Sequence, residues 1–228
     1  MLAWHFLRDD QKLKYPPYTL VEVGQKLTVD PPLILCNWGL HASKRAIEAL
    51  RYAPGPIACR VELSGEILED DDKVCATERT VLKMIDATNI LHEFACWCAE
   101  QALLQEREAG REPDPRSWAA VDAKRKWLRG EITDSELAAV WAAAWAAARA
   151  ATRVAARAAA GAAASAAART AAWDTAWDAA KAAAGAAASA AARTAAWTAA
   201  RDAARDAQNT QLEKMLLEAM EGRRNERD

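Results

Sequence analysis

The chain has 228 residues, a formal net charge of −2 and 52% hydrophobic residues, so it is long enough to bury one or two cores. No stretch approaches the roughly 20 apolar residues of a membrane span, and the amino terminus lacks the apolar run of a signal peptide. Five cysteines without a C-x-x-C pair predict reduced, buried thiols rather than a disulfide framework. These observations predict a soluble, cytoplasmic protein.

Charge divides the chain unevenly. Residues 1–115 contain 13 Lys and Arg against 19 Asp and Glu, a net charge of −6, whereas the remainder contains 17 against 13, a net charge of +4. The two halves therefore differ in kind, and the second half would attract an acidic partner weakly.

Short apolar segments bounded by prolines predict strands in the first 72 residues. The predicted strands are AWHFLR, TLVEV, LILC and IACRVELSGEIL. Before the last of them, SKRAIEALRY predicts a short helix with Ser43 as a suitable N-cap. The acidic run EDDD at 69–72 is typical of a solvated loop that closes a strand, and a cation site is the less favoured alternative.

Helical spacing dominates the chain from Thr77 onward. Apolar residues three and four apart predict one amphipathic helix that extends to about residue 108. Asp114 and Pro115 then cap and start a helix that ends at Gly130. Thr133 and Glu136 form a capping box that opens a proline-free helical segment.

These elements predict two regions of different class. We expect an α+β domain over residues 1–112, in which a small, mostly antiparallel sheet packs against two helices. A connecting helix over 113–132 leads to an all-α, alanine-rich tetrapeptide-repeat region over 133–228.

A four-residue repeat organises the second region. Every fourth residue from Trp141 to Asn209 is Trp, Arg, Lys, Gly, Ser or the final Asn, and two of the other three columns are almost pure alanine. Alanine is the strongest helix former, so helix is the expected local state. Alanine columns let helix backbones approach closely. The column of Trp, Arg, Lys, Gly and Ser, which we call the Trp/Arg stripe, winds around a straight helix, because a spacing of four residues exceeds the roughly 3.6 residues of one helical turn.

We expect the alanine columns to be the contact face of a homo-oligomer or of a folded-back bundle. The tryptophans assigned to this contact are Trp141, Trp145, Trp173, Trp177 and Trp197. A nucleic-acid partner for the Trp/Arg stripe is less favoured, because Arg and Trp lie four residues apart, where cation–π pairing within one helix accounts for them. A solvated spacer is the third alternative. Whether the helix is continuous or folds back near Gly161 or Gly185 stays open.

Chemically capable side chains concentrate in residues 37–56, around a strand-to-helix turn. The candidate ligand-binding residues are Trp38, His41, Ser43, Arg45 and Tyr52, together with Glu78. His92 and Cys96, four residues apart, would make half of a zinc site, but core burial is favoured because no second pair matches them. We therefore expect no metal and no cofactor.

The stretch CNWGLHASKRAIEALRYAPGPIACRVELSGEI, followed by KVCATERTVLKM, resembles an uncharacterised domain of bacteriophage and prophage hypothetical proteins. The resemblance lies in the GLHA turn, the A-L-x-Y-A helix end and the V-E-x-x-G-E strand, and covers about residues 1–105. It implies a phage-type accessory protein in the cytoplasm of a bacterial host, without an assigned activity.

A second resemblance concerns Gly39-x-His41-x-Ser43, the following Tyr52 and the V-x-L-x-G strand at 61–65, which are similar to the nicotinamide pocket of ADP-ribosyltransferases. It implies that Tyr52 stacks on nicotinamide and that Glu78 is the catalytic acid. The amino-terminal histidine of those enzymes has only a poor substitute in His5.

The favoured function is therefore a non-enzymatic accessory protein. It would self-assemble through its alanine-rich helices and display a domain that sequesters a nucleotide-like host defence signal, because linked copies raise avidity. The alternatives are an ADP-ribosyltransferase-like enzyme using NAD, or nucleic-acid binding by the Trp/Arg stripe.

Overall fold

The structure is a computed structural model that describes residues 1–15, 17–150 and 195–225, and it divides into two compact units. The first unit combines Met1–Thr88 with Asn209–Asp228, and the second is Asn89–Gln208. The end of the chain thus groups with its beginning, whereas the sequence suggested one continuous carboxyl-terminal region.

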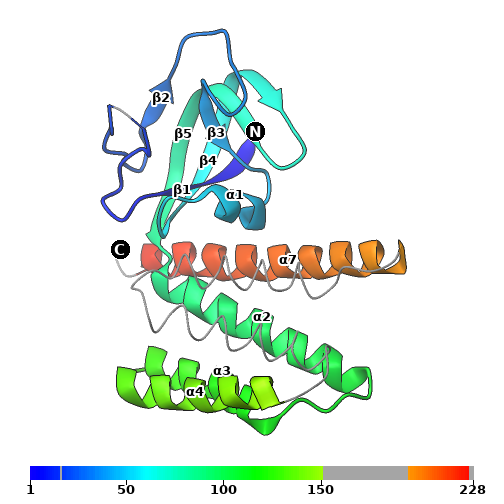
Figure 1. Cartoon of the computed structure of the whole chain (residues 1–228). Helices are drawn as coiled ribbons and strands as arrows, with labels where there is room; N and C mark the ends of the chain where they lie inside the picture. The colour runs from blue at the N-terminus through cyan, green and yellow to red at the C-terminus, as the bar shows by residue number, and fades with distance from the viewer. Residues whose placement is uncertain (16, 151–194, 226–228) are drawn as a thin grey trace. The chain divides into compact units, whose positions relative to one another are not determined.

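A long antiparallel hairpin is the framework of the first unit (Figure 1). Strands β4 (Ile57–Glu69) and β5 (Val74–Asp86) pair along their whole lengths. The other strands attach to this hairpin, also antiparallel: β1 (Leu2–Leu7) pairs with β4, and β2 (Lys26–Thr28) and β3 (Leu40–Ala42) pair with β5. The predicted small antiparallel sheet is therefore confirmed.

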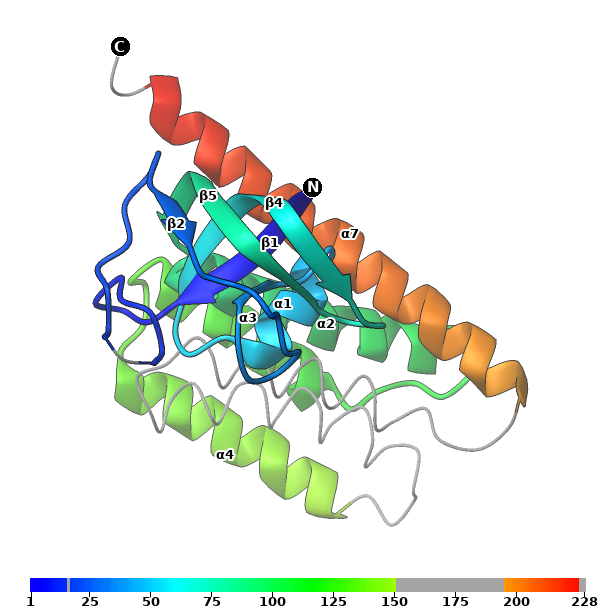
Figure 2. The same ribbon diagram turned by 90° about the horizontal axis from the view of Figure 1, so that it is seen from above.

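The sheet curls until its two edges meet. Trp4 and Ser43 form an isolated antiparallel bridge, with N···O distances of 2.7 and 2.9 Å, and this bridge joins β1 to the end of β3. Register shifts at Arg60/Val61 and between Ser64 and Ile67 interrupt the β4–β5 ladder, and such bulges increase bending and twist. Helix α1 (Ala46–Tyr52) follows β3 and lies against β1 (Figures 1 and 2).

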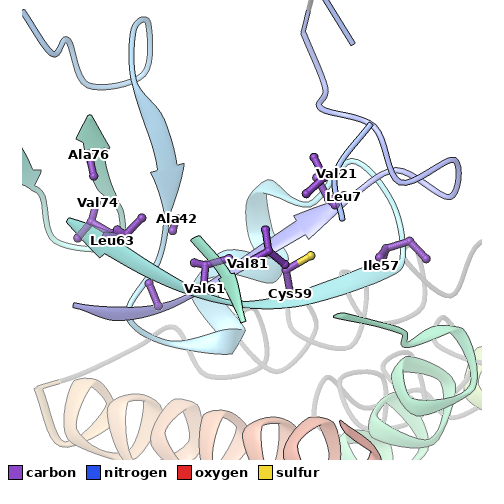
Figure 3. Packing of buried hydrophobic residues seen from close by; sticks show 11 residues of the cluster. Leu7, Val21, Ala42, Ile57, Cys59, Val61, Leu63, Val74, Ala76 and Val81 are labelled. Carbon is purple, nitrogen blue, oxygen red and sulfur yellow. The ribbon is translucent and has the colours of Figure 1, made fainter. Parts of the chain in front are cut away.

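The inner face of the curled sheet carries one apolar core, shown in Figure 3. It contains small and branched side chains, as expected where several strands approach one another closely. Its buried members are Ala3, Leu7, Val21, Ala42, Ile57, Cys59, Val61, Leu63, Val74, Ala76 and Val81.

Three helices follow the sheet: α2 (Thr88–Glu108), α3 (Pro115–Leu128) and α4 (Asp134–Ala150). In the second unit, α2 and α3 share a small apolar cluster and a network of ion pairs. The guanidinium of Arg125 binds Glu93 at 2.8 Å and Glu100 at 2.9 Å. The cluster consists of Cys96, Ala99, Leu103 and Val121, with Trp118 packed against it.

The predicted helix caps are confirmed. The Asp114 carboxylate accepts a hydrogen bond from the Arg116 N–H at 2.9 Å, and Pro115 is the first residue of α3. Ahead of α4, the Thr133 N–H donates to Glu136 at 2.8 Å and the Glu136 N–H donates back to Thr133 Oγ1 at 3.3 Å.

The predicted helix start at Thr77 is wrong, because residues 77–86 belong to β5. Leu82 is the extra residue at a bulge, opposite the Arg60/Val61 step. The bulge shifts the alternation of side chains by one residue, so Val81 and Met84, three residues apart, both contact the apolar core. A bulged strand thus produced a spacing that is typical of a helix.

Three local predictions are also wrong. The segments TLVEV and LILC are loops whose Leu20 and Ile34 form only isolated bridges, and the short strands β2 and β3 were missed. Ser43 does not cap α1, because the N-cap is Arg45 and its side chain makes no capping hydrogen bond. The Ser43 backbone is used in the bridge to Trp4 instead.

The two described ends of the alanine-rich region are helical: α4, and α7 (Ala195–Asn225). Residues 151–194, with Gly161, Gly185, Trp173 and Trp177, lie outside the described residues. In the part of the chain that is described, no helix is both long and apolar enough to cross a membrane.

Gly65, at the second bulge, has a φ of +73°, and a Cβ atom there would collide with Thr77 Oγ1. Gly24 has a φ of +86° with open space around it, so it is a matched control. We expect Gly24→Ala to cost about 1 kcal/mol from backbone strain alone. Gly65→Ala should cost roughly 1–3 kcal/mol more because of the collision. Urea unfolding of both full-length variants measures the two losses, and equal losses would contradict this account of the bulge.

Candidate functional site

A tight loop before β3 places several chemically capable residues at the surface. Within it, Ile34 and Trp38 exchange backbone hydrogen bonds at 2.9 and 2.7 Å. Cys36, at the tip, is exposed and adopts a left-handed conformation with a φ of +66°. A non-glycine residue in this conformation needs support from its surroundings.

His41 supplies that support. Its Nε2 atom accepts a hydrogen bond from the Cys36 N–H at 3.0 Å, so the imidazole must be neutral at this nitrogen. Burial lowers the pKa of His41, and the charges of Arg79 and Lys73 lower it further, while a hydrogen bond with the Gly39 backbone acts in the opposite direction. His41 therefore holds the loop as a neutral ring.

A surface group that we call the Cys36 cluster surrounds this loop. It consists of Cys36, His41, Tyr52, Asp72 and Lys73. The Tyr52 hydroxyl donates to Asp72 at 2.7 Å, and the Lys73 ammonium lies 5.4 Å from the centroid of the Tyr52 ring. Interaction with the Cys36 side chain is the largest effect that raises the pKa of Lys73. Burial, together with the bond to Asp72, raises the pKa of Tyr52.

The end of helix α1 and the turn of the β4–β5 hairpin bring these residues together. Tyr52 is the last residue of α1, whereas Asp72 and Lys73 lie in the turn of the β4–β5 hairpin. Arg51 strengthens the connection, because its Nη1 donates to the same Asp72 oxygen at 2.7 Å.

Gly39 lets the loop approach β5 closely. With a φ of +132°, it lies so near to Cys75 that a Cβ atom would collide with the sulfur and come within 2.9 Å of Leu33. The Cys75 thiol donates to the Trp38 carbonyl at 3.3 Å. The loop is therefore held from both sides, by His41 and by Cys75.

A positive charge lies in the core beneath the cluster. Arg79 is 2% exposed, and no carboxylate pairs with it among the described residues. Its Nη1 donates to the His41 carbonyl at 2.8 Å, while its Nε finds no hydrogen-bond partner in the described part of the chain. Burial lowers the pKa of Arg79 to about 10 and that of the neighbouring His5 well below 6.5. Unpaired buried charge is costly, and perturbed groups of this kind concentrate at functional sites.

The predicted site residues occupy three separate places. His41 and Tyr52 belong to the Cys36 cluster. Trp38 lies at the base of the same loop, and its indole donates to the Asp30 carbonyl at 2.7 Å. Ser43 and Arg45 lie at the start of α1, where Ser43 is buried and Arg45 forms an ion pair with Glu48 at 3.8 Å.

Glu78 lies elsewhere on β5. Its carboxylate accepts a hydrogen bond from Ser64 at 2.6 Å and pairs with Lys26 at 2.9 Å, and both contacts lower its pKa. Tyr52, by contrast, interacts with Asp72 and Lys73 at the hairpin turn. The two side chains that the ADP-ribosyltransferase resemblance assigns to one pocket thus have separate surroundings.

Sequence reasoning missed Cys36, Asp72, Lys73 and Arg79. Asp72 and Lys73 lie in or next to the acidic run that the sequence analysis treated as a solvated loop, and the structure confirms that this run leads into the loop between β4 and β5. Arg79 fell within the predicted helix that begins at Thr77. The pairing of β5 with Leu27 of β2 and Leu63 of β4 places Arg79 inside the sheet.

The predicted burial of His92 and Cys96 is confirmed, with 5% and 4% exposure. The His92 ring meets Trp127 edge-on at 5.6 Å, and burial lowers the pKa of His92 to about 4. Within the described ranges, no group of three or more His, Cys, Asp or Glu residues is arranged to hold a metal ion.

The first unit is thus a small α+β domain with a curled antiparallel sheet and a candidate surface site at the start of β3. Residues 1–93 match the family model of a domain of unknown function, DUF7666. A search of curated proteins and a search of solved structures found no match. The expected uncharacterised domain at this end of the chain is thus confirmed, whereas its phage setting stays a prediction.

The three histidines predict how stability depends on pH. Burial lowers the pKa of each in the folded state, so below pH 6.5 the unfolded chain binds protons that the folded chain does not. We expect the free energy of unfolding to fall between pH 6.5 and 5, by at most about 1.4 kcal/mol per pH unit for each histidine. Urea unfolding at several pH values tests this. His41→Gln should show a shallower dependence, and a flat wild-type profile would contradict the prediction.

Thiol labelling tests the environment of Cys36. Cys36 is exposed and the other four cysteines are buried, so Ellman's reagent should modify one thiol rapidly in the native protein and five in denaturant. Cys36→Ser should remove the rapid phase. A rapid phase that survives this substitution would show that another thiol is accessible.

Proposed function

We propose that this chain is a non-enzymatic binding protein whose amino-terminal domain binds a planar, anionic, nucleotide-like ligand at the Cys36 cluster. The alanine-rich helices hold several copies together, and in the phage setting that the sequence resemblance implies, the assembly sequesters a host defence signal.

One observation carries the ligand class: two cations, Arg79 and Lys73, lie near the loop, and Lys73 lies beside the exposed ring of Tyr52. Arg79 and Lys73 both lower the pKa of His41, so the net field of these two cations at the loop is positive. Tyr52 is 46% exposed beside Lys73 and Arg51, although Asp72 offsets part of this charge. An aromatic face flanked by cations suits a base attached to a phosphate.

The same contacts support binding rather than acid–base chemistry. His41 uses Nε2 to accept from Cys36 and also binds the Gly39 backbone, so its ring is committed to holding the loop. A general base needs a free nitrogen within reach of a substrate proton. The rigid loop is suited to presenting a surface of fixed shape.

Self-association rests on the four-residue repeat. Its flanking helices α4 and α7 support a helical state at both ends of the repeat. Of the five assigned tryptophans, Trp141 lies partly buried in α4. Close packing of alanine columns then explains why the repeat keeps its phase.

Isothermal titration calorimetry of the full chain with NAD, ADP-ribose and cyclic dinucleotides tests the binding site. For whichever of these probes the wild type binds, we expect Tyr52→Ala and Lys73→Ala each to lower the affinity by about tenfold, the effect of losing one stacking or ionic contact.

Lys14 and Tyr15 provide a matched control, because this exposed pair has the same cation-to-ring distance of 5.4 Å in a loop outside the cluster. Lys14→Ala and Tyr15→Ala should leave the affinity unchanged. Equal losses from both pairs, or no binding of any of these probes, would remove the Cys36 cluster as the proposed nucleotide site.

A further inference from the structure

The start of α1 is capped by residues from the far end of the chain. The side chain of its own N-cap residue, Arg45, makes no capping hydrogen bond to the helix. Instead, the Ala46 N–H donates to Glu213 Oε1 at 3.1 Å and the Ile47 N–H donates to Asn209 Oδ1 at 3.2 Å. A segment of α7 therefore provides the cap that the local sequence lacks.

Glu213 also ties this segment to the sheet. The same oxygen accepts a hydrogen bond from the Trp4 indole at 3.0 Å, and the Arg60 guanidinium lies 4.7 Å from the Trp4 ring centroid. Trp4 itself is 1% exposed and bridges to Ser43. One carboxylate thus joins β1, α1 and α7, and hydrogen bonds to a charged partner are stronger than neutral ones.

The docked segment has the pattern of an amphipathic helix. Leu212 and Leu216 are fully buried and Met220 is 7% exposed, at spacings of four residues. Further along, Lys83 Nζ and Glu221 lie 4.0 Å apart. Figure 2 shows these carboxyl-terminal turns, coloured red, alongside the sheet. Such a stripe with a few polar anchors is how helices bind protein surfaces.

We propose that this docking surface, formed by Trp4, Ala46, Ile47, Arg60 and Lys83, binds the carboxyl-terminal helix of a second copy of the chain. The whole second unit, Asn89–Gln208, lies along the chain between this surface and the docked segment of α7, which begins at Asn209. The contacts are the same whether the helix comes from its own chain or from another, so the interface itself does not favour either arrangement.

The four-residue repeat favours exchange of α7 between copies over docking within one chain. Helix exchange rests on the proposed self-association, because copies aligned through the alanine columns raise the local concentration of foreign helices at each domain. Exchange then links the domains into a closed assembly without any new type of contact.

Cross-linking of full-length chains tests this exchange. In a Cys36→Ser background, one chain carries Lys83→Cys and another carries Glu221→Cys, and the two are refolded together and treated with a short bis-maleimide. We expect an inter-chain product of twice the chain mass, with the cross-link between positions 83 and 221. A sample without treatment is weighed by native mass spectrometry.

Two controls define the background. Asn209→Ala with Glu213→Ala in the second chain removes the polar anchors and should reduce the inter-chain product severalfold. Lys14→Cys in place of Lys83→Cys measures chance collisions. A third sample carries both Lys83→Cys and Glu221→Cys on one chain. If the protein is a multimer and the cross-link forms only within this doubly substituted chain, exchange is overturned but self-association is not. A monomer would overturn both.

Discussion

The pairing of β4 with β5 is the constraint on which the first unit depends. Every other strand pairs with one of these two, and the bulges in the hairpin bend it so that β1 and β3 meet at the Trp4–Ser43 bridge. The hairpin turn then lies beside the end of α1, where Asp72 receives hydrogen bonds from Arg51 and Tyr52. The β4–β5 hairpin therefore underlies both features: its bulges bend the sheet, and its turn supplies Asp72 to the surface cluster.

His41 connects the core of this unit to its surface. Its carbonyl accepts from the buried Arg79, while its ring accepts from the backbone of the exposed Cys36. A neutral imidazole is required for the second bond, and burial with two nearby cations keeps it neutral. The two cations that we propose to attract an anionic ligand thus also favour the neutral ring that holds the loop.

Helix α1 has only two turns, and both of its ends depend on distant residues. At its start, Glu213 and Asn209 bind the free N–H groups, and at its end Tyr52 binds the hairpin turn. So short a helix is marginal by itself, since helix nucleation is costly. Helix α1 therefore connects the docked segment of α7 to the Cys36 cluster.

The sequence by itself determined the features that depend on neighbours along the chain. It predicted β1, β4, the body of α1, the caps of α3 and α4, and the residues 37–56 in which Trp38, His41 and Tyr52 lie, because propensity, capping and turn chemistry act over a few residues. Only the tertiary structure decided the rest. The bulge at Leu82 made a strand resemble a helix, and strand pairing buried Arg79 beneath His41. Glu213 became the cap of a helix that lies far away in sequence. These contacts join residues distant along the chain, and no local pattern specifies which distant partner will satisfy a free N–H group or a buried charge.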